Sequence, residues 1–534
     1  MRHINSPEES EQKLLFDAEL GAWWHTQLSP EGLRQLSEGM EGVMRRSILK
    51  LLPAEKLGER FHEFLGRPTK ELYAMCGLML LAEFRDLTID QAASAWSFDA
   101  SVQYALNLPR DRQYLCPRTL DTYRQLLRED EAAQGVFEEV TTALVKELGV
   151  EIGKQRLDST HVLSNMAKFG RLKLLAVTTK RFLTQLLRHH PEEYEALPDD
   201  LRARYGVAES RIFGFGTKNP VPREEALQTV GEDMVVLLER FAEVEAITSR
   251  TSYKALDRVF KENCEVNARG RVNLTDKAVD ENGQSSRTLQ NPSDEGAGYS
   301  GHKGAGYQVQ LAQACGQQEE DMPGLVVACV PQSAADSDSG AVQAVIEQQT
   351  RMGTLPKEQL ADTAYGSEAN VALCASVAVT LVAPVPGRAA TAKGKKQTDP
   401  EGASSPATWS EVRRAEQESG EWKKRYALRS GIEGVNEALD RTTGMKALRV
   451  RGRCAVHMAI YLKVTGWNIK CAATILRLRA RRQHRAARAQ NQGLEGSKTP
   501  QNGSSGTGKP QSRRSPRRLR LRHRRSSPRQ QLRP

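Results

Sequence analysis

Arg156-Leu157-Asp158-Ser159-Thr160-His161-Val162-Leu163-Ser164-Asn165 is a short alternating run that follows a helix-rich region, and its pattern predicts a β-strand. The predicted strand carries one carboxylate, Asp158, near its middle. Two further acids stand where a mixed α/β fold brings them beside it: Asp362 ends a second predicted strand, and Glu433 lies on a predicted helix. Three carboxylates from separate elements form the kind of site that binds divalent metal ions.

Three segments around these acids resemble a family of enzymes. They are Leu157-Asp158-Ser159-Thr160, Ala361-Asp362-Thr363-Ala364-Tyr365-Gly366 and Tyr426-Ala427-Leu428-Arg429-Ser430-Gly431-Ile432-Glu433-Gly434. In this order they resemble a DDE transposase of the bacterial insertion-sequence type, from the branch with a Tyr-x2-Arg-x3-Glu signature. The likeness covers roughly residues 60 to 470.

The resemblance implies DNA strand cleavage and strand transfer at the terminal inverted repeats of the element that encodes the protein. Asp158, Asp362 and Glu433 would be the catalytic residues and the metal ligands. They would hold two Mg²⁺ ions, with Mn²⁺ as a substitute, about 3.5 to 4 Å apart on either side of the in-line displacement. Asp158 would contact both ions, and each of the other two acids one.

Residues near the predicted helix supply candidate DNA contacts. Tyr426 and Arg429 would hold phosphates at the transposon end; otherwise Tyr426 packs and Arg429 pairs with a nearby acid. The family commonly has a lysine seven residues after the glutamate. Asp440 stands there, and Arg441 beside it is the substitute candidate. Because a carboxylate repels phosphate, a catalytically weakened transposase-derived DNA-binding protein or repressor remains an alternative, as does a hydrolytic nuclease of the same fold.

The charge distribution limits how the folded part can bind an anionic partner. The net charge is +11, but residues 477–534 hold 18 Lys and Arg and one acid, Glu495, which leaves −6 for the rest. Residues 1–476 must therefore bind double-stranded DNA through local patches of positive charge. Synapsis of two transposon ends, which the resemblance implies, predicts a dimer on DNA. The eight scattered cysteines indicate reduced thiols, and the charged first twenty residues indicate no signal peptide. We expect a cytoplasmic, nucleoid-associated protein without a membrane-spanning segment.

Residues 1–150 are predicted to form an all-α domain. Apolar residues recur at spacings of three and four, and the segment 78–96 resembles a helix-turn-helix. The resemblance makes it a DNA-end-binding domain, while the pattern alone is equally typical of a helical packing domain. The candidate phosphate contacts are Arg110, Arg112, Arg118 and Arg124.

Residues 151–478 are predicted to form the catalytic domain. The pattern alternates as three strands, helix, strand, helix, strand and helix, with a helical insertion at about 165–265, which is the order of an RNase H-like mixed sheet. Lys303, in a glycine-rich turn, is a further candidate DNA contact. A mobile loop is predicted at about 387–420 and a disordered Arg-rich tail at 479–534.

Overall fold

The computed structural model describes residues 2, 4, 23–109, 114–129, 132–268, 272–316, 322–387 and 409–496. Residues 1–479 form one compact unit, and residues 480–534 form a second. The first unit is a mixed α/β structure built on one sheet, which confirms the predicted α/β class. No helix of the described segments is both long and apolar enough to cross a bilayer.

The residues before the sheet are helical, as predicted. α6 is buried on nearly all sides, and the capping box of Thr88 and Gln91 starts α7 after a short turn in which Asp86 has φ 51°. α7 contains no Lys or Arg, so this second helix of the helix-turn-helix pattern offers phosphates no cation. Arg110 and Arg112 lie outside the described residues. The elements are α2 (Trp23–Gln27), α3 (Pro30–Glu38), α4 (Met40–Val43), η2 (Met44–Ile48), η3 (Leu49–Leu51), α5 (Ala54–Gly58), α6 (Leu72–Phe84), α7 (Ile89–Phe98), α8 (Ala100–Ala105), α9 (Pro117–Glu129) and α10 (Ala132–Leu148).

The sheet has the strand order β6-β5-β1-β7-β8, and the short β4 pairs with the start of β5. β1 runs antiparallel to β5 and parallel to β7, so it is the strand at which the direction of pairing changes. The elements are β1 (Lys154–Val162), β4 (Gly298–Ser300), β5 (Gly304–Ala314), β6 (Val326–Ser333), η5 (Ser339–Ala341), α17 (Val342–Met352), β7 (Glu358–Leu360), η6 (Thr363–Tyr365), α18 (Glu368–Ser376) and β8 (Thr380–Val382).

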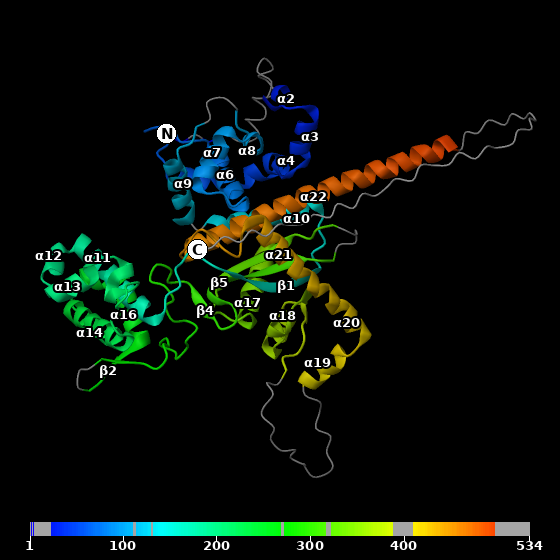
Figure 1. Cartoon of the computed structure of the whole chain (residues 1–534). Coiled ribbons are helices and arrows are strands. Elements are labelled where there is room, and N and C mark those ends of the chain that lie inside the picture. Colours follow the sequence, from blue (N-terminus) through cyan, green and yellow to red (C-terminus); the bar gives the residue numbers. More distant parts are fainter. Residues whose placement is uncertain are drawn as a thin grey trace, which may run out of the picture. The chain divides into compact units, whose positions relative to one another are not determined.

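Helices cover both faces of the sheet (Figure 1). Side chains of alternate residues point to opposite faces of a strand, so Leu311 and Ala312 of β5 enter different cores. Leu311 packs in the large core that includes α10, α21 and α22, whereas Ala312 packs with α17 and α18. The large core also contains the buried residues of α6.

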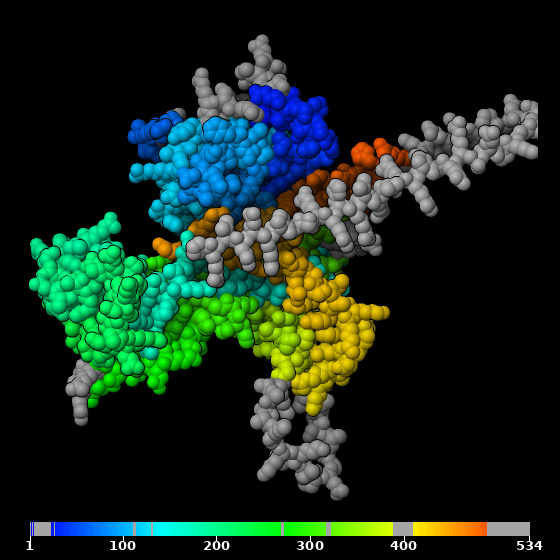
Figure 2. All heavy atoms as spheres, viewed as in Figure 1, coloured from blue at the N-terminus to red at the C-terminus, as the bar shows by residue number. Residues whose placement is uncertain are grey.

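The insertion between β1 and β5 has a core of its own and forms a packed group of helices, green in Figure 2. It was predicted at 165–265, but its core extends to Val272 and Leu289. Its base is tied to the sheet by Asp294, which is buried and accepts hydrogen bonds from the hydroxyls of Ser164 and Tyr307. The elements are α11 (Arg171–His189), α12 (Pro191–Glu195), α13 (Asp199–Gly206), η4 (Glu209–Gly214), α14 (Arg223–Phe241), α15 (Glu245–Thr248), α16 (Thr251–Asn263), β2 (Cys264–Val266) and β3 (Val272–Leu274).

The helices after the sheet correct two predicted boundaries. α19 begins at Trp409, so part of the segment predicted as a loop is helical, and residues 388–408 lie outside the described part. The last helix continues to Gly496, well past the start predicted for a disordered tail at 479, and residues 497–534 lie outside the described part. The elements are α19 (Trp409–Gln417), α20 (Gly420–Ala427), η7 (Leu428–Ser430), α21 (Gly431–Thr443) and α22 (Arg453–Gly496).

A charged junction connects α6 with α22. The ammonium of Lys463 is buried, with 2% of its side chain exposed, and donates to the carbonyls of Glu83 and Thr443 and to Asp86 Oδ1 at 2.9, 2.6 and 3.1 Å. Arg449 donates to Asp86 as well, at 2.8 Å. All three donors of the Lys463 ammonium therefore have acceptors.

Candidate functional site

Asp158, inside β1, and Asp362, two residues after the end of β7, lie on the same side of the sheet. Arg156 of β1 is paired with Leu360 of β7, and in each of these two segments the aspartate follows two residues later. Since neighbouring residues in register on parallel strands point to the same face, both carboxylates face the helices that follow β8. Asp362 also accepts a hydrogen bond from the amide of Ala364 at 2.9 Å, which starts η6.

Glu433 reaches the same place from the helical side. It lies in the first turn of α21, directly after the 3₁₀ turn η7, which separates α21 from α20 within the helix predicted to carry Glu433. The spacing of four residues nevertheless keeps Glu433 beside Arg429.

One guanidinium contacts all three acids. Arg429 Nη2 lies 3.2 Å from Asp158 Oδ1 and 3.8 Å from Asp362 Oδ2, and Arg429 Nη1 lies 3.0 Å from Glu433 Oε1. The structure thus brings together all three predicted carboxylates. Of the two alternatives for Arg429, it shows the one in which Arg429 pairs with an acid. The exposed fractions of the Asp158, Asp362 and Glu433 side chains are 15%, 35% and 65%, so the site opens to solvent on the Glu433 side.

The electrostatics of the site leave it short of positive charge. Burial raises the pKa of Asp158, the neighbouring charge of Asp362 adds to this, and Arg429 opposes it. Burial alone would lower the pKa of Arg429, but the charges around it, Asp158 first, raise it overall. Three carboxylates around one guanidinium carry an excess of negative charge that a further cation would offset.

Three other residues position the site, and no sequence pattern indicates them. Asn436 is buried in α21 and donates to Asp158 Oδ2 at 3.3 Å. Arg156 donates to the carbonyl of Leu428 at 3.2 Å and passes so close to Gly431 that a Cβ there would lie 1.7 Å from its Nη1. A side chain at position 431 would therefore displace the Arg156 guanidinium from its place beside η7. Only coordinates could identify these contacts, because each joins elements distant in sequence.

The other predicted DNA contacts fall into different surroundings. Lys303 is exposed and donates to Ser159 Oγ at 3.1 Å, next to Asp158 in the sequence. Tyr426 stacks on Trp422 with ring centroids 4.8 Å apart, so its ring packs as the alternative proposed.

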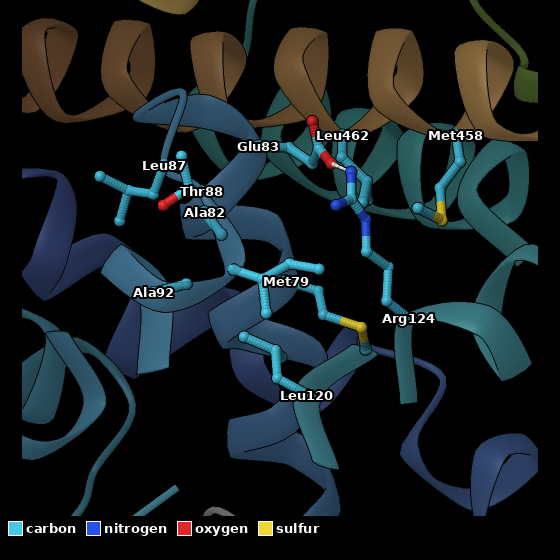
Figure 3. Close-up of a pocket in the computed structure, with 11 residues that line it drawn as sticks. Met79, Ala82, Glu83, Leu87, Thr88, Ala92, Leu120, Arg124, Met458 and Leu462 are labelled. Atoms are coloured by element: carbon cyan, nitrogen blue, oxygen red, sulfur yellow. Dashed lines mark hydrogen bonds and ion pairs between the residues drawn. The ribbon is translucent and has the colours of Figure 1, made fainter. Parts of the chain in front are cut away.

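The remaining predicted arginines differ in how accessible they are. Arg118 and Arg441 are exposed. Arg124 pairs with Glu83 beneath α22, beside a pocket lined by Met79, Leu120 and Met458 (Figure 3). This ion pair occupies the guanidinium, so the structure gives no support to Arg124 as a DNA contact.

The donor set suits a hard divalent cation in its chemistry. Carboxylate oxygens are the ligands that Mg²⁺ and Mn²⁺ prefer, and a positive group already sits among these three. In the present arrangement no group of three or more His, Cys, Asp or Glu side chains within the described ranges could hold an ion. The residues fit a metal site by type, while Arg429 contacts the oxygens that an ion would use.

Comparison with known families adds a second line of evidence. Residues 390–472 match a family described as a transposase DDE domain. The matched segment includes Tyr426, Arg429 and Glu433, and it does not reach Asp158 or Asp362. No curated protein and no solved structure matched the chain. The match to a transposase DDE domain supports a DDE transposase, a class of protein that acts on DNA.

Proposed function

We propose that this chain is a DDE-type transposase that cleaves DNA and transfers strands at the terminal inverted repeats of its own insertion sequence. The observation that carries the proposal is the convergence of Asp158, Asp362 and Glu433 on one guanidinium. The match at residues 390–472 supports it from the sequence side. So does the strand order β6-β5-β1-β7-β8 with β5 antiparallel, which is the arrangement expected for an RNase H-like domain.

The residues of the site have separable roles in this proposal. The three carboxylates hold divalent metal ions, which would activate a water or 3′-hydroxyl and stabilise the leaving oxygen of a phosphodiester. Positive charge for the DNA backbone comes from Arg429, Lys303, Arg441 and Arg118. Tyr426 lies near the end of α20, directly before the η7 turn that carries Arg429. Two copies of the chain would hold two transposon ends in a synaptic complex.

A cleavage assay with the full chain tests the proposal. The substrate is a duplex that carries the inverted repeat flanking the element, with Mg²⁺ or Mn²⁺ present. We expect nicking at the repeat boundary and strand joining to a target duplex. Asp158→Ala should stop cleavage while a gel-shift assay shows unchanged binding to the repeat, because Asp158 faces the other acids inside the site.

The same assay separates the competing functions. Binding to the repeat without cleavage by the intact chain would favour a DNA-binding repressor and contradict the proposal. Cleavage of any duplex without joining would indicate a hydrolytic nuclease. Asp440, which raised the repressor alternative, has a structural explanation, because its carboxylate accepts a hydrogen bond from the amide of Lys446 at 2.8 Å where α21 ends.

A further inference from the structure

Arg429 contacts the oxygens that a metal ion would need. Its two terminal nitrogens face Asp158, Asp362 and Glu433 at 3.2, 3.8 and 3.0 Å. A guanidinium and a divalent ion repel one another at such distances, so an ion would bind these carboxylates less tightly while Arg429 stays among them. Removing Arg429 would free one oxygen of each acid for an ion.

We propose that Arg429 is a removable substitute for the metal: it neutralises the three carboxylates in the DNA-free protein, and a DNA phosphate draws it away, so that DNA and divalent ions bind cooperatively. This inference rests on the proposed transposase function. It assigns Arg429 a role in the absence of DNA as well as in its presence.

The contacts of Arg429 are incomplete, which favours an exchange of partners. Its Nε is buried and has no hydrogen-bond partner among the described residues, and the carbonyl oxygen of the Asn436 side chain is in the same condition. A buried polar group without a partner is destabilising, because its hydrogen bond to water is lost and not replaced. Lys463 at the charged junction, by contrast, has an acceptor for every donor. Arg429 therefore keeps one donor that its present partners do not use.

The surrounding backbone confines the exchange to the side chain. Arg156 binds the carbonyl of Leu428 and lies against Gly431, so the ends of η7 are fixed to β1. The Arg429 side chain can rotate about its own bonds without moving this turn. On the open side of the site Glu433 is 65% exposed, which leaves a route for phosphate to approach the guanidinium. Arginine suits this exchange because its planar fork binds carboxylate and phosphate in the same geometry.

The cooperativity follows from linkage. An ion that must compete with Arg429 binds less tightly than it would to an empty site, and any ligand that removes Arg429 restores that affinity. The effect is reciprocal, so DNA must tighten metal binding by the same factor by which metal tightens DNA binding. Coupling between two sites is typically about 5- to 150-fold.

A titration with Mn²⁺, in which the spectroscopic signal of the free ion is recorded, measures this coupling without relying on catalytic activity. The DNA is a duplex that ends at the inverted-repeat boundary with 3′-deoxy termini, so no strand transfer occurs. Asp158→Asn protein with the same duplex reports the ions that DNA and the rest of the chain bind. We expect the Asp158-dependent Mn²⁺ affinity of the unaltered chain to rise about tenfold when this duplex is added.

Three variants assign the effect to Arg429. Arg429→Gln should bind Mn²⁺ about tenfold more tightly without DNA and gain nothing from adding it, because no cation competes. Arg429→Lys keeps a positive charge and should stay close to the unaltered chain. Arg425→Gln is the matched control: Arg425 lies one turn earlier, pairs with Glu358 at 2.6 Å, and should leave the tenfold gain intact.

The outcomes distinguish this inference from the proposed function. An unchanged Mn²⁺ affinity of DNA-free Arg429→Gln, or an unaltered chain that binds Mn²⁺ equally with and without DNA, would overturn the cooperative exchange and leave a metal-dependent transposase standing. If no variant binds Mn²⁺ in an Asp158-dependent manner even with DNA, the proposed function itself is wrong. Unfolding temperatures of the variants show whether each is folded, and the Mn²⁺ affinity of the unaltered chain with and without DNA tests the inference even if Arg429→Gln does not fold.

Discussion

The three-carboxylate site and the charged junction are both clusters of opposite charges, but they differ in how completely they are satisfied. At the junction Glu83 and Asp86 face Lys463, Arg124 and Arg449, and the buried ammonium has an acceptor for each donor. At the site three acids face one guanidinium that retains an unpaired nitrogen. Charged groups whose hydrogen bonds are all satisfied join elements of the structure. Charged groups with unsatisfied hydrogen bonds leave a place for a ligand.

The largest expected effect tests the functional half of this comparison. Asp362→Asn should lower the rate of cleavage about 10³-fold, since metal ligation supplies several kcal/mol to the transition state and 1.36 kcal/mol is tenfold. Stability should change by less than about 1 kcal/mol, as is usual for partly exposed positions, because the asparagine oxygen still accepts from Ala364. Single-turnover cleavage and urea unfolding measure the two quantities.

Glu358→Gln is the control for this prediction. Glu358 begins β7, the strand that leads to Asp362, and it pairs with Lys154 and Arg425. Its cleavage rate should stay within a few-fold of the unaltered chain. Cleavage by Asp362→Asn at near the normal rate would remove Asp362 from the site.

A smaller effect tests the structural half. Asp86→Asn removes the carboxylate that contacts the buried Lys463 ammonium at 3.1 Å and leaves only that of Glu83, at 3.9 Å, so it should lower the free energy of unfolding by about 3 kcal/mol near neutral pH. Burial would raise the pKa of Asp86, but Arg449 and Lys463 outweigh it and hold the pKa below 3.8. The folded state therefore favours the ionised carboxylate, so this contribution is present above 3.8 and is lost as the pH falls through the lowered pKa.

Urea unfolding across the acidic range checks this sign. The difference between Asp86→Asn and the unaltered chain should shrink below pH 3.8. Arg449→Gln, which removes an exposed partner of the same carboxylate, should cost less than about 1 kcal/mol. Equal losses of unfolding free energy from the two substitutions would mean that the buried Lys463 ion pair stabilises the protein no more than an exposed ion pair does.

The smallest effect concerns charges that belong to neither cluster. Arg481, Arg485 and Arg488 are exposed on α22 at spacings of four and three residues, so they share one helical face. Changing all three to glutamine should lower the slope of log affinity for DNA against log salt by about 2 to 3, because each phosphate contact contributes about 0.9. Gln483→Ala on the same helix should leave the slope unchanged; equal slopes for both proteins would exclude this face from DNA binding.

The sequence predicted much of the sheet and the meeting of the acids. The strand pattern and the phase of Asp158 and Asp362 relative to their strands follow from residue order, which is why the carboxylates lie together. The extent of α22 was not predicted, because the composition of residues 479–534 taken as a whole is typical of a disordered segment. Residues 477–488 are mostly Arg, Ala and Leu, which favour helix, while Gly, Ser and Pro dominate only later.

The contact of Arg429 with three acids lay beyond sequence reasoning for a different reason. Whether an arginine four residues before a glutamate faces phosphate or carboxylate depends on side-chain rotation and on what other elements place nearby. Asn436 and Arg156 were missed for the same cause, since each acts across more than 270 positions of the chain.

The tie beneath the helical insertion has a consequence for how this protein can change. Asn291 donates to the carbonyl of Ala167, and Ser164 and Tyr307 both bind Asp294, so the chain leaves the sheet and returns to it at one narrow place. A segment whose two ends are clasped in this way can lengthen, shorten or be replaced without shifting the strands on either side. The insertion is therefore the part of the molecule most free to diverge between related sequences, while the strand that carries Asp158 stays in register.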